Sequence, residues 1–506
     1  MNVSWPLSDL LAGFAEFPAT CDRLVTGLSN DSRQVRPGDL FLATRGFHHH
    51  GLEFLPAVRA ARAAAIAWEP PFAGELPQAA DLPLIRVDNL SRRIGPLARR
   101  FYNDPGRDLR IIGITGTDGK TSCAHLIAHV LQDEQAPCGI LGTLGQGVLG
   151  VAQPAAHTTP DALTVQRWLA DLRGQGVRFA TMEVSSHALD QERVAGVDFA
   201  IAVLTNLGRD HLDYHRDVAS YAAAKARLFI DHQPSQAVLN FNDPFGRQLM
   251  ATLSDRSVIS YGIGAPPPLT GGEPVWGEAP TFSARGVNVS FHSSWGEGLL
   301  ASRLLGHFNA SNLLAALSTV LALGMPLADA VQRLSRAAPI MGRMERFGGE
   351  HGLPLVVVDY AHTPQALEQA LRALRNHCAG RLWCVFGCGG DRDAGKRPLM
   401  GAIAERDSDQ VIVTDDNPRS EDPALIVQAI LSGMRKPAQV QVIEDRRQAI
   451  QQAIAEAATT DVVLVAGKGH EDYQLVGNRR IAFSDREIVR DCLAARDPIG
   501  EQRRAS

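Results

Sequence analysis

The sequence lacks a long apolar run, a long basic run and any pair of cysteines with C-x-x-C spacing. No stretch approaches the roughly 20 apolar residues that cross a bilayer, and the first residues show no basic segment followed by an apolar one. We therefore expect neither membrane insertion nor export. The seven cysteines are widely scattered and odd in number, which favours reduced thiols and a cytoplasmic location.

The sequence also lacks a large excess of charge of one sign, since it has 50 basic and 55 acidic residues. Without a basic run that could neutralise a phosphate backbone, nucleic acid is not an expected partner. The composition, 45% hydrophobic and only 6% aromatic, is that of an ordinary globular protein rather than a disordered or fibrous one. A chain of 506 residues exceeds what one hydrophobic core normally supports, so we expect about three domains.

Two strong turn signals, at residues 103–106 and 339–342, suggest where the domains meet. We predict domains over residues 1–105, 106–338 and 339–506. The first reads as a smaller α/β domain with short strands and one Ala-rich helix over 55–65. In the other two, apolar strands alternate with helical patterns, which is typical of α/β domains with parallel sheets. The predicted strands are 109–114, 179–184, 199–205 and 237–240, then 355–359, 382–386, 410–414 and 461–466. Residues 262–300, rich in Gly, Pro and Ser, are a predicted β-rich excursion.

A glycine-rich loop, Gly113-Ile-Thr-Gly-Thr-Asp-Gly-Lys-Thr121, follows the first of these strands and opens a predicted helix. In such a turn the backbone N–H groups and the helix N-terminus bind phosphate oxygens, and the lysine adds a full charge. Lys120 is then a phosphate clamp and Thr121 a Mg²⁺ ligand. The spacing is a variant of the standard G-x-x-x-x-G-K-[ST], because position 114 is Ile. The loop predicts that the protein binds ATP.

Polar residues follow the next strands at the edge where parallel sheets bind ligands. Glu183 ends one strand and is a candidate Mg²⁺ ligand. His211 and His215, at helical spacing, could instead form a zinc pair, but a third ligand at useful spacing is missing. Cys384 and Cys388 are expected to be buried and unreactive.

Five segments, in this order along the chain, resemble the Mur ligase family: the loop, then residues 182–187, 205–215, 342–345 and 359–363. The chain is most similar to members that add the third residue of the peptidoglycan stem peptide to UDP-N-acetylmuramoyl-L-alanyl-D-glutamate. The motif Asp-Asn-Pro-Arg at 416–419 marks those that add meso-diaminopimelate. The resemblance implies a central P-loop-type parallel-sheet domain, a C-terminal Rossmann-like amino-acid-binding domain and an N-terminal UDP-binding domain. It also implies a monomer that serves cell-wall synthesis, cell shape and division.

The resemblance further implies the catalytic and nucleotide residues. Lys225 reads as an ordinary helix lysine, yet it matches the family lysine that CO₂ carbamylates, which yields an anion able to hold Mg²⁺. Two Mg²⁺ ions are expected, with Thr121, Glu183, His211 and carbamylated Lys225 as protein ligands; Lys120 joins the last three as a catalytic residue. The expected ATP contacts are Gly116, Thr117, Asp118, Gly119, Lys120, Thr121, Ser122, Asn309, Arg343, Asp359 and His362.

Two further sets would hold the other substrates. Arg419 can bind the second carboxylate of diaminopimelate through two parallel hydrogen bonds, and Glu471 can pair with its distal ammonium. The full expected diaminopimelate set is Arg392, Asp416, Asn417, Pro418, Arg419, Gly467 and Glu471. The expected contacts to the UDP substrate are Asn30, Ser32, Phe47, His48, His49, Thr158, Thr159, Ser185, Gln191 and Arg193.

The implied reaction transfers the ATP γ-phosphoryl group to the D-glutamate γ-carboxylate, and the amine of diaminopimelate then attacks the acyl phosphate. Two alternatives stay open at this point. Folylpolyglutamate synthetase shares the fold but would lack the UDP-binding domain and Asp-Asn-Pro-Arg. A nucleotide-dependent switch would hydrolyse nucleotide without a ligase substrate, although the sequence has no Asn-Lys-x-Asp motif for reading guanine.

Overall fold

The computed structural model describes residues 3–46, 49–76, 81–133, 136–155, 157–266, 272–283, 285–337 and 339–496. The chain divides into two compact units. The first consists of Met1–Gly262, Pro266–Val275 and Ala315–Pro326. The second consists of Ile263–Ala265, Trp276–Leu314 and Leu327–Ser506.

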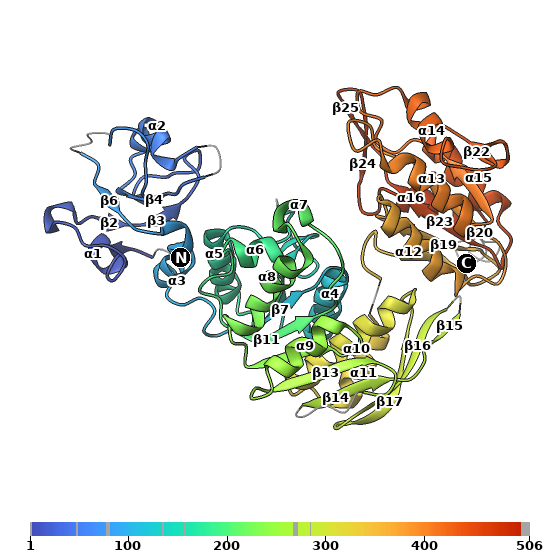
Figure 1. Cartoon of the computed structure of the whole chain (residues 1–506), viewed down its shortest axis with the longest axis horizontal. Coiled ribbons are helices and arrows are strands. Elements are labelled where there is room, and N and C mark those ends of the chain that lie inside the picture. The colour runs from blue at the N-terminus through green and yellow to red at the C-terminus, as the bar shows by residue number, and fades with distance from the viewer. Residues whose placement is uncertain are drawn as a thin grey trace, which may run out of the picture. The chain divides into compact units, whose positions relative to one another are not determined.

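The first unit begins with a small α/β domain built on a four-stranded parallel sheet (Figure 1). Helices α1 (Leu7–Leu10) and α3 (Leu90–Phe101) share a core with one face of the sheet, and α2 (Leu55–Ala60) shares a core with the other. The predicted helix over 55–65 is too long: it ends at Ala60, because residues 65–68 form a fully buried strand. A short buried apolar run fits either structure by pattern alone. The strands are, in spatial order, β3 (Gly27–Ser29), β4 (Asp39–Ala43), β5 (Ala65–Trp68) and β6 (Leu84–Arg86).

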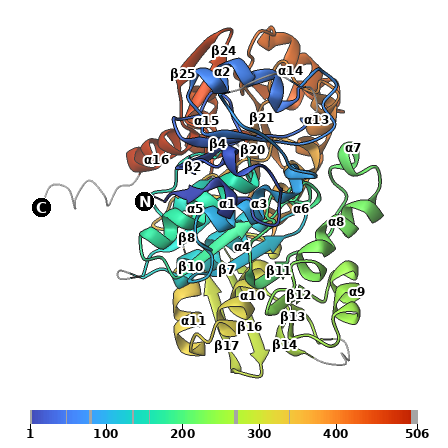
Figure 2. The same cartoon turned by 90° about the vertical axis from the view of Figure 1, so that its left-hand side faces the viewer.

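A larger sheet follows in the same unit, and Figure 2 shows its strands side by side. From β13 to β8 all neighbouring pairs are parallel, whereas β8 and β9 are antiparallel. Because β7 lies between β10 and β11, the carboxyl ends of these three strands meet at one edge. The helix α4 (Lys120–Leu131) leaves from that edge. These strands belong to an 11-stranded sheet. Their order in it is β13 (Val258–Ile263), β12 (Gln236–Asn240), β11 (Phe199–Leu204), β7 (Arg110–Thr115), β10 (Phe179–Glu183), β8 (Cys138–Gly142) and β9 (Gly145–Val148).

The predicted β-rich excursion is confirmed. After β14 (Glu273–Gly277), the strands β15 (Thr281–Ser283), β16 (Gly286–Ser293) and β17 (Gly296–Ser302) form an antiparallel array. Two helices come next, α10 (His307–Ala322) and α11 (Leu327–Ser335).

The rest of the second unit is a six-stranded sheet with helices on both faces, as expected of a Rossmann-like domain. One face packs against α12 (Pro364–Arg375), α13 (Lys396–Asp407) and α14 (Pro423–Leu431). The other packs against α15 (Arg446–Glu456) and α16 (Asp485–Arg496). The order is β18 (Glu345–Gly348), β19 (Leu355–Asp359), β23 (Val462–Ala466), β20 (Leu382–Phe386), β21 (Gln410–Val413) and β22 (Gln441–Val442), where only β18 is antiparallel. A hairpin, β24 (Tyr473–Val476) with β25 (Arg479–Ala482), follows β23.

The cysteines behave as expected. All seven are free thiols, and Cys384 and Cys388 are buried. Burial raises the pKa of Cys388 to about 12, so its thiol stays protonated and unreactive. In the part of the chain that the structure describes, no helix is long and apolar enough to cross a membrane.

Candidate active site

The glycine-rich loop joins β7 to α4 and has a backbone that only glycine adopts easily. Gly116 has φ +152° and Gly119, the residue before the helix, has φ +81°. Lys120 Nζ donates hydrogen bonds to the carbonyl oxygens of Gly116 and Thr117, each at 2.8 Å. The lysine therefore folds back over the loop and brings a positive charge to the N-terminus of α4, where anions bind.

The segment after β11 holds this loop in place. Thr205 Oγ1 donates to Asp118 O at 2.6 Å, and Asn206 Oδ1 accepts from Asp118 N at 3.0 Å. Gly208 N donates to Thr117 Oγ1 at 2.7 Å. Sequence reasoning assigned no role to these loop-holding residues, although their place directly after a strand at the same sheet edge could have indicated one.

Glu183 ends β10 and is only 1% exposed. Its Oε2 accepts from Thr121 Oγ1 at 2.9 Å and from Thr143 Oγ1 at 3.2 Å, and its Oε1 accepts from Thr143 N at 2.9 Å. Burial raises the pKa of the carboxyl group, while Lys120 and the hydrogen bonds act in the opposite direction. A buried carboxylate beside a hydroxyl and a phosphate-binding loop offers the oxygen ligands that Mg²⁺ prefers.

Lys225, in α8 (Val218–Ile230), is also 1% exposed. Its Nζ donates to Gly116 O at 2.7 Å and lies 4.5 Å from the centre of the Tyr221 ring. Burial, and secondly the charge of Lys120, lower the pKa of Lys225 well below its ordinary value. The two lysines thus reach the same carbonyl oxygen of the loop, and Lys225 favours the neutral amine there.

His211 belongs to a group of aromatic rings beside this loop. Its ring centre lies 4.8 Å from that of His187 and 6.3 Å from that of Tyr221. His215 is buried and its Nε2 lies 2.9 Å from Ser186 Oγ. Among the described residues, no three His, Cys, Asp or Glu side chains are grouped so that they could hold a metal ion. Of the predicted metal ligands, Thr121 and Glu183 touch directly, whereas His211 and Lys225 both border Tyr221.

Residues predicted to bind the muramoyl-dipeptide lie in one network around the end of β10. Arg193 donates to Thr159 O at 2.8 Å and through Nε and Nη2 to Gln191 Oε1 at 2.9 and 2.6 Å. Thr159 Oγ1 donates to the carbonyl oxygen of Glu183 at 2.8 Å and accepts from Ser185 N at 3.1 Å. The fifth, Thr158, lies 3.1 Å from Thr143 through their hydroxyl oxygens. The network is therefore continuous with the Glu183 site.

The predicted uridine and pyrophosphate contacts are more scattered. Asn30 Nδ2 donates to Asp161 Oδ1 at 3.0 Å, which ties the first domain to the start of α5 (Ala162–Gly174). His49 is exposed and lies 2.9 Å from Glu53, whereas Ser32 is half-buried. Phe47 and His48 lie outside the described residues.

In the second unit, three predicted nucleotide contacts surround Tyr360. The guanidinium carbon of Arg343 lies 5.1 Å from the centre of the Tyr360 ring, and His362 Nδ1 lies 2.8 Å from Tyr360 O. Asp359 accepts from Met344 N at 2.7 Å, and burial raises its pKa. Asn309, on α10, is buried and donates to Leu305 O at 2.8 Å.

The Asp-Asn-Pro-Arg segment follows β21 and carries a residue in a rare conformation. Arg419 has φ +51°, which costs a non-glycine residue free energy. Its Nη1 donates to Gly390 O at 2.8 Å. A Cβ atom at Gly389 would lie 2.8 Å from Arg419 Nη1 and 3.8 Å from Arg392 Cγ. The guanidinium group of Arg419 and the Cγ atom of Arg392, both from the predicted diaminopimelate set, therefore lie beside this glycine.

The other predicted diaminopimelate residues come together around a lysine. Asn417 Nδ2 donates to Glu471 Oε2 at 3.0 Å. Lys468 Nζ lies 2.9 Å from Asn417 Oδ1, 3.2 Å from Glu471 Oε2 and 3.4 Å from Asp416 Oδ1. Gly467 fits against Asp416, because a Cβ there would lie 3.3 Å from Asp416 Oδ2. Sequence reasoning gave Lys468 no role.

Pro418 supports the same loop through its carbonyl oxygen, which accepts from Glu421 N at 3.1 Å. A Cβ atom at Gly390 would clash with that oxygen at 1.9 Å. The loop after β21 and the loop after β20 therefore pack backbone against backbone.

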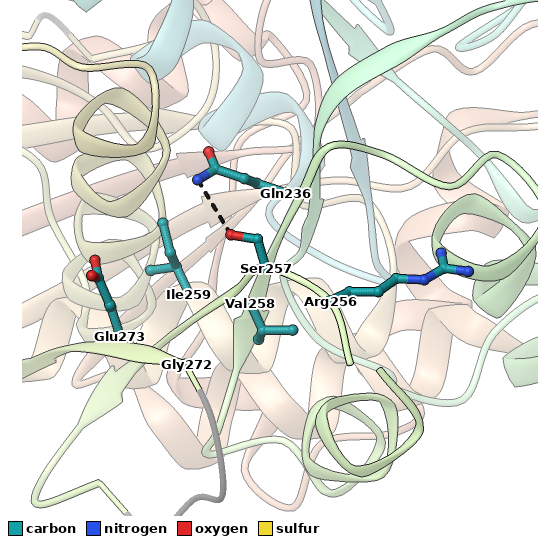
Figure 3. Close-up of a pocket in the computed structure, with 7 residues that line it drawn as sticks. All are labelled: Gln236, Arg256, Ser257, Val258, Ile259, Gly272 and Glu273. Atoms are coloured by element: carbon teal, nitrogen blue, oxygen red, sulfur yellow. Dashed lines mark hydrogen bonds between the residues drawn. The ribbon is translucent and has the colours of Figure 1, made fainter. Parts of the chain in front are cut away.

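A separate pocket of about 320 Å³ lies in the first unit (Figure 3). It is at the opposite end of the sheet from the phosphate loop, because it opens where β12 and β13 begin. None of its lining residues is a predicted site residue. They are Gln236, Arg256, Ser257, Val258, Ile259, Gly272 and Glu273.

Three segments of the chain match one family of enzymes. Residues 24–102 match the Mur ligase family catalytic domain, residues 114–320 the Mur ligase middle domain, and residues 342–469 the Mur ligase glutamate ligase domain. The chain is 48% identical, over 493 residues, to the UDP-N-acetylmuramoyl-L-alanyl-D-glutamate–2,6-diaminopimelate ligase of Alkalilimnicola ehrlichii, covering 96% of this chain and 97% of the relative. The chain belongs to the Mur ligase family.

Two further comparisons support this membership. The ligase of the same name from Pseudomonas aeruginosa is 50% identical over 480 residues, which is 95% of this chain and 97% of the relative. A solved structure of such a ligase is 34% identical with a TM-score of 0.74, and the match covers 97% of this chain and 99% of that one. The three-domain α/β Mur ligase fold expected from the sequence is thereby confirmed. The matched segments leave the exact boundaries at 105 and 338 as predictions.

Proposed function

We propose that this chain is a Mur ligase of the MurE type, which uses ATP to add meso-diaminopimelate to UDP-N-acetylmuramoyl-L-alanyl-D-glutamate in peptidoglycan synthesis. Identity of about half the residues over nearly the whole chain, to two ligases with this activity in their names, supports it. The single observation that supports the choice of amino acid is a cluster in which Arg419 and Arg392 lie beside Gly389 and Glu471 accepts a hydrogen bond from Asn417. Guanidinium groups suit a carboxylate, and a carboxylate suits an ammonium.

The reaction begins with ATP on the loop after β7. The γ-carboxylate of the D-glutamate attacks the γ-phosphorus, the bond to the β-phosphate oxygen breaks, and ADP leaves. The amine of diaminopimelate then attacks the acyl carbon, the amide bond forms, and phosphate and a proton leave. Lys120 neutralises charge on the phosphates, and backbone N–H groups of the loop position them.

Magnesium fits the residues beside this loop, because Glu183 and Thr121 supply adjacent oxygen atoms. Bound there, Mg²⁺ would offset the negative charge of the phosphates. Protein oxygens alone do not fill six coordination positions, so phosphate and water oxygens would complete them. In keeping with the family resemblance, His211 and carbamylated Lys225 would be further Mg²⁺ ligands.

Carbamylation of Lys225 requires a neutral amine that attacks CO₂ and releases a proton. The burial of Lys225 and its neighbour Lys120 both favour that neutral form. The resulting carbamate adds a negative charge at the loop, where Lys120 supplies a positive one.

The remaining roles follow the grouping of residues in each unit. Thr158, Thr159, Ser185, Gln191 and Arg193 would bind the carboxylates and amides of the muramoyl-dipeptide. In the first domain, Asn30, Ser32 and the turn around His49 would contact the UDP end. In the second unit, Asn309, Arg343, Asp359 and His362 would contact ATP. We further propose that the enzyme acts as a monomer in the cytoplasm and supports cell shape and division.

An omission assay tests the proposed activity. ADP release is measured with ATP and Mg²⁺ plus the UDP-dipeptide and meso-diaminopimelate, then with each substrate left out. We expect release only when both are present. Release that needs neither would indicate a nucleotide switch, and release with folate and glutamate would indicate a folylpolyglutamate synthetase; either result would overturn the proposal.

A further inference from the structure

Lys468 is a buried cation in the middle of the candidate diaminopimelate pocket. It lies directly after Gly467, at the carboxyl end of β23, and is 0% exposed. An ammonium group taken out of water is costly unless acceptors satisfy it. Its three N–H donors face three oxygens, those of Asn417, Glu471 and Asp416, at 2.9, 3.2 and 3.4 Å.

These contacts use all the hydrogen-bonding capacity of the ammonium. Lys468 therefore has no donor left for a substrate carboxylate, and it acts on residues that would touch the substrate. Both polar neighbours of Glu471, Lys468 Nζ and Asn417 Nδ2, bind Oε2. The Glu471 side chain keeps 17% of its surface exposed. Glu471 is thus held at Oε2 and remains partly exposed.

Asn417 is fixed by the same lysine. Its Oδ1 accepts from Lys468 Nζ and also from Leu475 N at 2.9 Å, which anchors the hairpin that begins at Tyr473. Two loops distant in sequence, one after β21 and one after β23, therefore meet at one ammonium group. Its loss would release the carboxylate, the amide and the hairpin together.

Charge balance gives this arrangement a consequence for specificity. The nearby Arg446 forms a buried ion pair with Asp485, so these two charges offset each other. The carboxylates of Asp416 and Glu471 and the ammonium of Lys468 then leave one net negative charge. One negative charge matches the single distal ammonium of diaminopimelate, while Arg419 and Arg392 match its carboxylate. A second uncompensated negative charge would favour a side chain that ends in an ammonium alone, such as that of L-lysine.

Resting on the function proposed above, we infer that Lys468 is a positioning and specificity-determining residue of the amino-acid pocket. It orients Glu471 and Asn417, and it sets the net charge that makes the pocket prefer a zwitterionic distal end to a purely cationic one. Neither role requires contact between Lys468 and the substrate.

Steady-state kinetics of Lys468→Met tests this inference, since Met keeps the length of the side chain and removes its charge. We expect the KM for meso-diaminopimelate to rise on the order of 10- to 100-fold, with the KM for ATP within about twofold of wild type. The ratio of kcat/KM for meso-diaminopimelate to that for L-lysine should fall by about tenfold or more. Lys468→Arg, which keeps the charge, should retain most of this ratio.

Asp461→Ala is the matched control for a purely structural effect. Asp461 lies at the opposite end of the same strand, where it accepts from Arg381 N at 2.8 Å and Trp383 Nε1 at 3.1 Å. Its loss should lower the melting temperature and leave the substrate ratio unchanged. If Lys468→Met changes the ratio no more than Asp461→Ala does, the inference is wrong.

The double variant Lys468→Met/Asp416→Asn restores the net charge while Glu471 remains. We expect it to recover part of the kcat/KM ratio that Lys468→Met loses. If Lys468→Met fails to fold, Asp416→Asn alone carries the test. Asp416→Asn alone should raise the ratio of kcat/KM for meso-diaminopimelate to that for L-lysine. An unchanged ratio in this variant would also contradict the inference. A wild-type enzyme that does not use meso-diaminopimelate would instead overturn the proposed function.

Discussion

Two buried ionisable side chains, Glu183 and Lys225, lie beside the phosphate loop, and burial acts on each in the direction of its neutral form. Ionising this carboxyl group and this amine costs free energy in the free protein. Bound phosphates and cations would lower that cost. The charge states of Glu183 and Lys225 therefore depend on the phosphates and cations that bind beside them.

Lys225→Ala tests the carbamate at this scale. We expect activity to fall on the order of 100-fold or more, because the anion is lost from the phosphate site. Added formate or acetate should restore part of it, since a small carboxylate can occupy the vacated space. Initial rates are measured with and without the added carboxylate, and wild type serves as the control that should not respond. Full activity of Lys225→Ala would rule out the carbamate.

Asp415 gives a prediction for pH dependence. Burial and the charge of Glu444 raise its pKa to about 6 in the folded protein. The folded state therefore holds this proton more tightly than the unfolded state, so the group costs stability as pH rises from about 4 to 6. Asp415→Asn cannot ionise. Its melting temperature should match that of wild type near pH 4 and exceed it near pH 7; a constant difference across this range would refute the assigned cause.

At the scale of the element, the loop after β7 depends on close packing around Gly116. A Cβ atom there would lie 1.8 Å from Thr205 Oγ1, which is the hydroxyl that holds Asp118. We expect Gly116→Ala to raise the KM for ATP by about tenfold or more, because the loop must shift out of its phosphate-binding conformation.

Gly176→Ala is the control for this prediction. Gly176 also has a positive φ, +72°, but a Cβ atom there would meet no atom of the described residues within 4 Å. This variant should cost about 1 kcal/mol of stability from the backbone alone and leave the KM for ATP unchanged. Equal KM effects in the two variants would show that the contact with Thr205 is unimportant.

Several elements could be predicted from the sequence because they are runs of buried apolar residues with turn signals at their ends. The strands β7, β10, β11, β19 and β23 fall within two residues of the predicted ranges. The strands β8 and β9 were not predicted, since their glycine-rich sequence resembles a loop and only their pairing next to β10 makes them strands. Pairing is a tertiary property that a local pattern does not contain.

Some residues of the candidate site could likewise be predicted from the sequence, and others could not. Lys120, Glu183 and the Asp-Asn-Pro-Arg segment follow strand ends, so their types and positions could be read directly. The burial of a side chain could not be read from the sequence. Lys225 and Lys468 look like ordinary lysines there, yet they are 1% and 0% exposed. Their roles depend on which carbonyl and carboxylate oxygens the fold brings to them.

For the molecule as a whole, the proposed contacts to ATP and to diaminopimelate are separate sets of residues, so we expect the binding of the two substrates to respond separately to mutation. We expect Arg419→Ala to raise the KM for meso-diaminopimelate on the order of 10- to 100-fold, because a charge-assisted pair is lost. The KM for ATP should stay within about twofold. Arg406→Ala is the control, because that arginine is 53% exposed and its ion pairs are with Asp407 and Glu368, neither of which is a predicted site residue. Equal changes in both KM values would refute the assigned pocket.

The central claim is that the chain forms the peptide bond to meso-diaminopimelate and selects it over L-lysine. The most direct measurement incubates the enzyme with ATP, Mg²⁺, the UDP-dipeptide and equal concentrations of the two amino acids, and identifies the UDP-linked product by mass spectrometry. We expect the diaminopimelate tripeptide to dominate, with one ADP released for each molecule formed. A product that carries mainly lysine, or ADP release without a UDP-linked tripeptide, would contradict the account.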